Sequence, residues 1–228
     1  MSKVVVTGGS GFIGQQICRE ALARGHEVVS VSRSGCPAEL RSAAWAEGVT
    51  WHAGDVLWPE RWRGVLAGAD ALIHCVGIIS EQPKQGVTFE RLNGDSAIVA
   101  AREAERAGVG TLLFLSAAFA PPLTSSRYLA NKRRAEQDLL QRDLRTVVFR
   151  PGLVYGAGNP AASLWASLIL AFQALPAVPR YLSPLEHTTI ARAALNAVDT
   201  PETAGIYGVD AIRRLANART ASEHSEPR

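Results

Sequence analysis

The feature that most constrains this chain is a glycine-rich turn near its N-terminus, placed between an apolar run and a helical pattern. The run Lys3–Thr7 is short and rich in β-branched residues, as a strand buried on both faces requires. Gly8, Gly11 and Gly14 follow, and apolar residues then recur at helical spacing as far as Gly25. We therefore expect a strand, a tight turn and a helix in the order of a dinucleotide-binding unit.

Each of the three glycines has its own task in such a turn. Gly8 allows a sharp bend, Gly11 lets backbone N–H groups approach a pyrophosphate without a Cβ in the way, and Gly14 lets helix and strand pack closely. The helix N-terminus adds unpaired donors and a partial positive charge. We expect a bound nucleotide to contact these glycines and the residues between them, Ser10, Phe12 and Ile13.

Strand and helix patterns then alternate along the chain. Strand-like runs occupy 27–32, 49–53, 70–76, 111–116 and 146–150, with a late run at 205–209. Helical patterns follow Pro59 and occupy 87–107, 128–142 and 210–216. This alternation predicts an α/β fold, a Rossmann-type doubly wound parallel sheet with helices on both faces. Ligands of such a sheet lie beyond the carboxyl ends of its strands.

Length and composition limit the remaining classes. The 228 residues suit a single nucleotide-binding domain at 1–217, with substrate-side segments at 156–217 and a polar, disordered tail at 218–228. The net charge of +3 is spread over scattered arginines, so nucleic-acid binding is not favoured. Three cysteines without metal-ligand spacing indicate free thiols, no metal site and a reducing compartment. The first strand starts directly after Ser2, with no signal peptide before it, which predicts a cytoplasmic protein.

The end of the second strand indicates which dinucleotide binds. An acidic residue there would hold the ribose hydroxyls of NAD, but Ser32, Arg33 and Ser34 stand in that place. Hydroxyl donors and a guanidinium suit a 2′-phosphate, so NADP(H) is the predicted cofactor. The alternative is that Arg33 is an ordinary solvated loop charge. After the third strand, Asp55, followed by Val56, is placed to accept from the adenine amino group, unless it is a plain turn aspartate.

A phenol and an ammonium occupy positions i and i+4 of one predicted helix. Tyr128 and Lys132 lie on the same face of the helix that follows the fifth strand. A nearby cation favours the ionised form of a phenol. Such a pair can pass a proton to or from a carbonyl or alcohol beside a nicotinamide, so both are candidate catalytic residues.

Taken jointly, these motifs resemble the short-chain dehydrogenase/reductase superfamily in its extended or atypical branch. The resemblance runs from Val4 to about Ala216 and rests on 7–14, 54–56, 74–77, Asn93-Gly94, Tyr128 with Lys132, and 150–156. The sequence that follows Ser116 is similar to that of the atypical group, which includes the nucleotide-binding accessory subunit of respiratory complex I and a fungal protein of coenzyme Q biosynthesis. The resemblance implies that Cys75, Val76 and Gly77 line the cofactor, that Lys132 holds the nicotinamide ribose, and that Pro151 and Gly152 border the nicotinamide amide.

One departure from the family pattern bears on activity. The family's catalytic serine or threonine usually lies about two residues beyond Ser116, where this chain has Ala118. Ser116 is then the candidate third catalytic residue, although it lies close to the sheet. We expect structural roles for two histidines. His74 should be a packed core residue, and His187 should begin a late helix.

The substrate side is short and apolar. The run 161–178 is interrupted by polar residues and Pro176, so a membrane-spanning helix is not expected. It suggests an apolar substrate, a protein partner or peripheral membrane contact, against the alternative of a helix packed on the body of the protein. Two hypotheses follow. One is an NADP(H)-dependent oxidoreductase acting on a small or apolar carbonyl, quinone- or lipid-related, and the other is a non-catalytic NADPH-binding module that serves an assembly or regulatory partner.

Overall fold

The computed structural model describes residues 1–121, 124–158, 163–164, 167 and 183–218. Within these residues a parallel sheet of seven strands has the order β3-β2-β1-β4-β5-β6-β9. The strands are β1 (Lys3–Thr7), β2 (Glu27–Ser32), β3 (Val49–Ala53), β4 (Ala71–His74), β5 (Thr111–Leu115), β6 (Arg145–Phe149) and β9 (Gly205–Tyr207). The strand order reverses between β1 and β4, and the crevice for ligands lies at that switch point.

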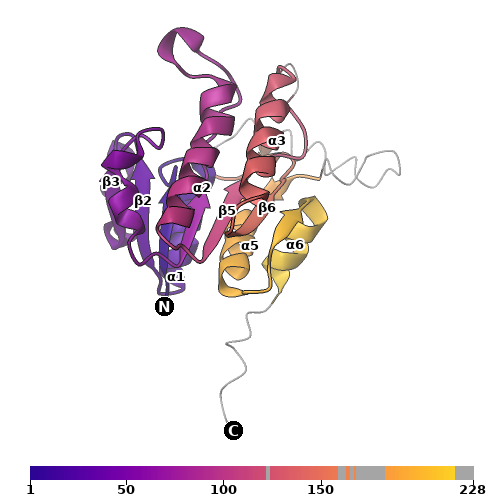
Figure 1. Cartoon of the computed structure of the whole chain (residues 1–228). Helices are drawn as coiled ribbons and strands as arrows, with labels where there is room; N and C mark the ends of the chain where they lie inside the picture. Colours follow the sequence, from indigo (N-terminus) through magenta and orange to yellow (C-terminus); the bar gives the residue numbers. More distant parts are fainter. Residues whose placement is uncertain (122–123, 159–162, 165–166, 168–182, 219–228) are drawn as a thin grey trace.

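Helices cover both faces of the sheet (Figure 1). One face carries α1 (Phe12–Ala23), α5 (His187–Asp199) and α6 (Val209–Asn217), and the other carries α2 (Ser96–Arg106) and α3 (Arg127–Leu140). Side chains alternate across the central strand, so that Val4 and Val6 join the core on the α1 side while Val5 joins the core under α2. The predicted doubly wound Rossmann-type fold is confirmed.

Some elements differ from their predicted form. The segment opened by Pro59 makes two short 3₁₀ turns, Pro59–Arg61 and Arg63–Leu66, and not a helix. Trp62 lies between them and is 1% exposed, with its indole N–H donating to the carbonyl of Val56 at 3.2 Å. We attribute the irregular conformation of this segment to the burial of Trp62, which outweighs the helical propensity of the neighbouring residues.

The predicted helix 87–107 also starts differently. Its first described helical turn is π-helical, Glu90–Asp95, and α2 continues from Ser96. A small second sheet pairs β7 (Val154–Tyr155) with β8 (Leu185–Glu186). Strands of two residues have no alternation that a sequence pattern could detect.

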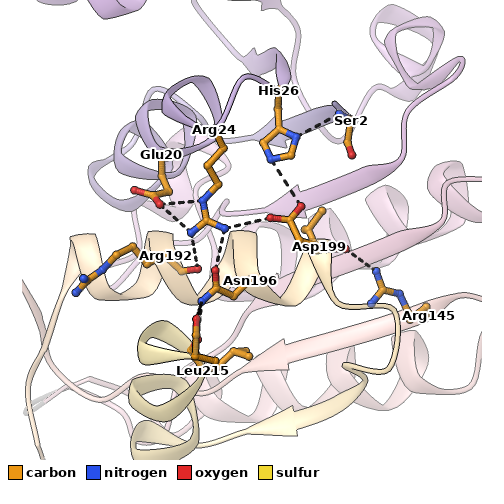
Figure 2. Close-up of polar contacts among 11 residues, drawn as sticks. Ser2, Glu20, Arg24, His26, Arg145, Arg192, Asn196, Asp199 and Leu215 are labelled. Atoms are coloured by element: carbon orange, nitrogen blue, oxygen red, sulfur yellow. Dashed lines mark hydrogen bonds and ion pairs between the residues drawn. The ribbon is translucent and has the colours of Figure 1, made fainter. Parts of the chain in front are cut away.

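Polar contacts fix α5 against α1 and α6 (Figure 2). Arg24 at the end of α1 donates to Asn196 at 2.8 Å and to Asp199 at 3.1 Å. Asn196 donates in turn to the carbonyl of Leu215 at 2.7 Å. Both polar ends of the Asn196 amide are thereby satisfied within a largely apolar helix contact, as buried polar groups require.

A second arginine holds the carboxyl end of α5. Arg145 at the start of β6 donates to the carbonyls of Ala197, Val198, Thr200 and Thr203 at 3.2, 3.1, 2.7 and 3.2 Å. Carbonyls at a helix end lack partners within the helix and carry partial negative charge, so one guanidinium neutralises and pairs several of them. Polar contacts therefore hold α5 both along its side and at its carboxyl end.

No helix in the described part of the chain has both the length and the apolar character needed to cross a membrane. The apolar run 161–178, with the exception of Ser163, Leu164 and Ser167, lies outside the described residues. The predicted disordered tail also lies outside them from residue 219 onward.

Candidate functional site

Two cavities meet along the carboxyl edge of the sheet. One, of about 210 Å³, is lined by the glycine turn, the ends of β2 and β3, and the loop after β4. The other, of about 450 Å³, is lined by the ends of β5 and β6 and by α3. Cys75, Gly77 and Ile78 line both cavities, which therefore form one elongated cleft across the switch point.

The glycine turn has the geometry that a phosphate group needs. Gly8 has φ +82°, and a Cβ on Gly14 would lie 2.2 Å from the carbonyl oxygen of Gly8, so only glycine allows α1 to start this close to the turn. Gly11 precedes α1 in an extended conformation and borders the smaller cavity. Since α1 has no side-chain N-cap, its first N–H groups are available to a bound anion.

The far end of the smaller cavity holds the residues predicted to select the dinucleotide. Arg33 lines it, is exposed, and has no ion pair or hydrogen bond with any described residue. Ser32 also lines it, and its hydroxyl donates to a carbonyl of the next turn at 2.8 Å. Asp55 lines it while its Oδ1 accepts from the N–H of Leu57 at 3.0 Å, so it is a turn aspartate and a cavity residue at once. Ser34 is exposed and does not line the cavity.

Most other predicted cofactor residues border the cleft. Gly8, Ser10, Gly11, Val56, Val76 and Gly77 line the smaller cavity, and Ile13, Cys75, Pro151 and Gly152 line the larger one. Phe12 does not line either; its ring packs edge-on against His187 with centroids 5.0 Å apart. His187 is the first residue of α5, as predicted.

Lys132 lies at the base of the larger cavity as a buried cation. Its Nζ donates to the carbonyl of Leu115 at 2.8 Å and lies 4.8 Å from the centre of the Phe114 ring. Burial lowers the pKa of Lys132 to about 8, against the raising effect of charges such as that of Glu136. A polyanionic ligand in the cleft would favour the charged form further, which suits the ribose-holding role that the family resemblance implies.

Tyr128 lines the same cavity, but its electrostatics differ from the expectation. Its ring packs edge-on against Phe89, with centroids 5.6 Å apart. Burial raises the pKa of the phenol, while the charge of Arg133 acts to lower it. The net direction is opposite to that expected of a phenol activated by a nearby cation, because desolvation dominates. The effect of Lys132 on the phenol stays a prediction.

Ser116 is part of a buried ionic cluster behind the cavity wall. Its hydroxyl donates to Oε1 of Glu136 and accepts from Nη1 of Arg133 at 3.1 Å. Arg150 also donates to Glu136, through Nε at 3.1 Å to each carboxylate oxygen. Burial would raise the pKa of Glu136, but hydrogen bonds from Arg150 and Ser116 and both arginine charges hold it low. Ser116 thus lines the cavity with its hydroxyl engaged elsewhere.

Asn93 is a site residue whose role the sequence did not predict. It lies in the π-helical turn, fully buried, and its amide accepts from the N–H of Ile78 at 2.8 Å and donates to the carbonyl of Ile78 at 2.9 Å. These two bonds fix the loop that lines both cavities. The feature that points to Asn93 is its π-helical turn, because such turns often mark functional positions. A π-helical turn has no periodic sequence pattern, so the sequence alone could not reveal it.

His74 is the packed core residue that the sequence predicts. Its ring is fully buried, with Nδ1 accepting from Thr7 at 2.8 Å and Nε2 donating to Ser96 at 3.1 Å, whose own hydroxyl donates to a backbone carbonyl. Burial, followed by the charge of Lys132, lowers the pKa of His74 to about 3. A neutral imidazole with both nitrogens paired is unsuited to acid–base work near neutral pH.

The fold and this cleft define a nucleotide-binding domain of the extended, atypical short-chain dehydrogenase/reductase class. Residues 4–179 match the NAD dependent epimerase/dehydratase family, and the chain belongs to that family.

Three relatives illustrate its range. The chain is 33% identical to the uncharacterized chloroplastic protein At1g32220 of Arabidopsis thaliana, over 94% of this chain and 77% of that protein. It is 31% identical to MIOREX complex component 2 of Saccharomyces cerevisiae, over 67% of this chain and 73% of that protein. It is also 31% identical to 2-alkyl-3-oxoalkanoate reductase of Stenotrophomonas maltophilia, over 69% of this chain and 52% of the reductase.

Solved structures share the fold. UDP-glucuronic acid 4-epimerase from Bacillus cereus, determined in complex with NAD, superposes with a TM-score of 0.67 at 16% identity, over 91% of this chain and 77% of the epimerase. At that identity the likeness establishes the architecture alone.

Two glycine substitutions should separate the role of the turn in binding from its role in folding. Gly11→Val should abolish nucleotide binding while leaving the melting temperature of the free protein nearly unchanged, because the new side chain extends into the cavity and its Cβ meets only the carbonyl of Gly8, at 3.2 Å. Gly14→Ala should lower the melting temperature, since its Cβ would collide with the backbone of the turn. Calorimetry with NADPH and thermal melts measure the two effects, and normal binding by Gly11→Val would show that the loop is only a turn.

A buried cation without a bound anion should cost stability. Lys132→Met is expected to raise the free energy of unfolding of the free protein at pH 7 by about 1–3 kcal/mol, because the folded pKa of about 8 lies below the ordinary 10.5. The cost in the wild type is complete below the folded pKa and disappears as pH rises to the unfolded value, so the advantage of the variant should shrink over that window. Nucleotide affinity should fall in the same variant. Urea melts at several pH values, with exposed Lys84→Met as the control, measure this; a variant no more stable than wild type at pH 7 would contradict it.

Proposed function

We propose that this protein is an NADP(H)-dependent oxidoreductase that acts on a small or apolar carbonyl compound. The observation that carries the proposal is the joined cleft, in which a cavity lined by the glycine turn meets a second cavity that Tyr128, Lys132 and an apolar wall line. That wall is formed by Ile13, Ile78, Ile79, Leu115, Phe119, Pro121, Leu153 and Val154. A carbonyl on an apolar chain or ring fits such a lining better than a charged or sugar substrate does.

The residues of the cleft have complementary tasks in this reaction. A bound nicotinamide supplies the hydride that forms the new C–H bond. Tyr128 donates its phenolic proton to the carbonyl oxygen, so that the C=O bond becomes an alcohol, and the phenolate recovers a proton from solvent. Lys132 holds the ribose, and the apolar wall excludes water from the reacting atoms. Ser116 has no direct part in this scheme, since its hydroxyl is bound to Glu136.

The preference for NADP(H) rests on Arg33. A guanidinium that lines the cavity without a partner among the described residues can pair with a 2′-phosphate, and a charge-assisted bond of this kind is strong. Ser32 lines the same end of the cavity, but its hydroxyl donates to the carbonyl of Gly35, so the proposed preference rests on Arg33.

A second candidate function is a non-catalytic NADPH-binding module that serves a partner complex. The observation that favours it is the wall after β5, where Ala118 occupies the usual serine place and the hydroxyl of Ser116 is engaged in the ionic cluster. One relative, by its name, is a component of a complex. Under this hypothesis the nucleotide stabilises the fold, and Tyr128 does not take part in a reaction.

Removal of one hydroxyl should decide between the two candidates. Tyr128→Phe should keep NADPH affinity within a few-fold and lower carbonyl turnover by about two to four orders of magnitude, because only the proton donor is lost. The measurement is NADPH oxidation across a panel of quinones, aldehydes and ketones, with Tyr207→Phe as the control, since Tyr207 packs on Phe149 away from the cleft. Unchanged turnover in Tyr128→Phe would exclude the proton role. No turnover in wild type, with NADPH still raising the melting temperature, would favour the binding module.

The cofactor preference is tested separately. Wild type should bind NADPH more tightly than NADH, and Arg33→Ala should lose about 1.5–3 kcal/mol, or roughly 10- to 100-fold, of NADPH affinity alone. Calorimetry on both cofactors measures this, with Arg41→Ala as a matched exposed arginine outside the cavity. Equal affinities in the wild type would refute the preference.

A further inference from the structure

The loop after β4 leads from the nucleotide half of the cleft to its apolar half. Val76 lines the smaller cavity only. Gly77 and Ile78 line both cavities, and Ile79 lines the larger cavity only. Ile79 is therefore the position at which this loop has left the part of the cleft that the glycine turn borders.

Ile79 is also an exposed apolar residue on an apolar wall. It is 67% exposed, whereas Ile78, Phe119 and Pro121, which line the same cavity, are partly buried. Single apolar residues scattered over a protein surface are common and need no explanation. Ile79 differs from them because it continues the lining of a cavity. The apolar wall thus extends to the rim of the cavity, where water now contacts it.

The backbone on both sides of Ile79 is held in place. The N–H and the carbonyl of Ile78 bond to the amide of Asn93 at 2.8 and 2.9 Å. Two residues beyond Ile79, the carboxylate of Glu81 accepts from the N–H of Phe89 at 2.7 Å. Ile79 is therefore presented at the rim by a loop that is anchored before and after it. A surface fixed in this way costs little ordering when a ligand covers it.

The polar groups of the larger cavity limit what a ligand can bring into it. Ser116, Tyr128 and Lys132 are the lining side chains with a hydroxyl or ammonium group. The hydroxyl of Ser116 donates to Glu136, and the ammonium of Lys132 donates to the carbonyl of Leu115 at 2.8 Å. The Tyr128 hydroxyl has no hydrogen bond to any residue in the described part of the chain. A substrate with one polar group on an apolar body matches this lining, since buried polar groups need partners.

We propose that the substrate is a ketone or aldehyde with a long apolar chain, which runs from Tyr128 along the apolar wall and leaves the cavity over Ile79. The proposal rests on the proposed function and deepens it, because it names the class of carbonyl compound and a residue that selects it. The cavity of about 450 Å³ must also hold the reacting end of the dinucleotide, so a long chain needs the apolar rim as well. The reaction stays the one described above, in which the carbonyl becomes an alcohol and NADPH is oxidised.

The dependence of turnover on chain length tests the proposal. Straight-chain methyl ketones from butanone to dodecan-2-one are assayed at saturating NADPH. In the wild type, kcat/KM should rise by up to about fourfold for each added methylene, mainly through KM, because each methylene leaves water for the apolar wall. Ile79→Ser should lower the ratio of kcat/KM for dodecan-2-one to that for hexan-2-one by about threefold or more, and Ile79→Leu should keep that ratio.

A matched control separates this effect from a general loss of surface hydrophobicity. Ile206 on β9 is 45% exposed and does not line the cavity, so Ile206→Ser should keep the wild-type ratio. A wild-type kcat/KM that does not depend on chain length would overturn the proposal. So would an Ile79→Ser variant whose ratio equals that of Ile206→Ser.

Chain binding is measured separately, without turnover. Secondary alcohols of the same chain lengths are added to the NADPH-loaded protein, and the rise in melting temperature is recorded. Dodecan-2-ol should stabilise the wild type more than hexan-2-ol does, and this difference should shrink in Ile79→Ser but not in Ile206→Ser. If no ketone is reduced, the proposed function fails. An alcohol effect that depends on Ile79 would then still support a site for an apolar chain, and its absence would overturn that site as well.

Discussion

The whole cleft is positioned by one close approach between the glycine turn and the first helix. At Gly14 there is no room for a single Cβ against the carbonyl of Gly8, so α1 begins immediately above the end of β1. The loop after β4 lies against the same turn, since a Cβ on Gly8 would lie 3.1 Å from the backbone of Cys75 and Val76. The α1 N-terminus and the ends of β2, β3 and β4 are thereby brought around one cavity. A longer separation between turn and helix would move the donors away from the sheet edge on which the other half of the cleft is built.

Charge burial is the second theme of the site. Lys132 in the cavity and Glu136 behind its wall are both buried, and burial of a charge is unfavourable unless the group finds partners. Glu136 meets this requirement with three donors, whereas Lys132 has a carbonyl and an aromatic face but no carboxylate hydrogen bond within the described part of the chain. The site is thus arranged to be more stable with an anionic ligand than without one.

The order and type of the elements could be predicted from the sequence because they depend on local patterns. The bounds of β2 and β3 match the prediction, since β-branched runs there end at turn residues. The glycine turn could be predicted for the same reason, whereas the positions of Val76 and Pro151 along the cleft were implied by the family resemblance. The contact of Ser116 with Glu136 and the clamp of Asn93 on Ile78 could not, because each joins residues 15 or 20 positions apart that only the packing of α2 and α3 brings together. The raised pKa of Tyr128 depends on burial, which no spacing reveals.

The meeting of the two cavities has a kinetic consequence. Since Cys75, Gly77 and Ile78 belong to both, a dinucleotide that spans the cleft would itself form part of the wall of the apolar cavity. On the proposed function, the compartment for the second reactant would be complete only in the binary complex, and Ile79, which is 67% exposed, lies on its wall. Such a shape would favour a sequence of events in which the dinucleotide arrives first and departs last. The concentration of reduced dinucleotide in the cell, more than that of the second reactant, would then set how much of the protein is ready to act.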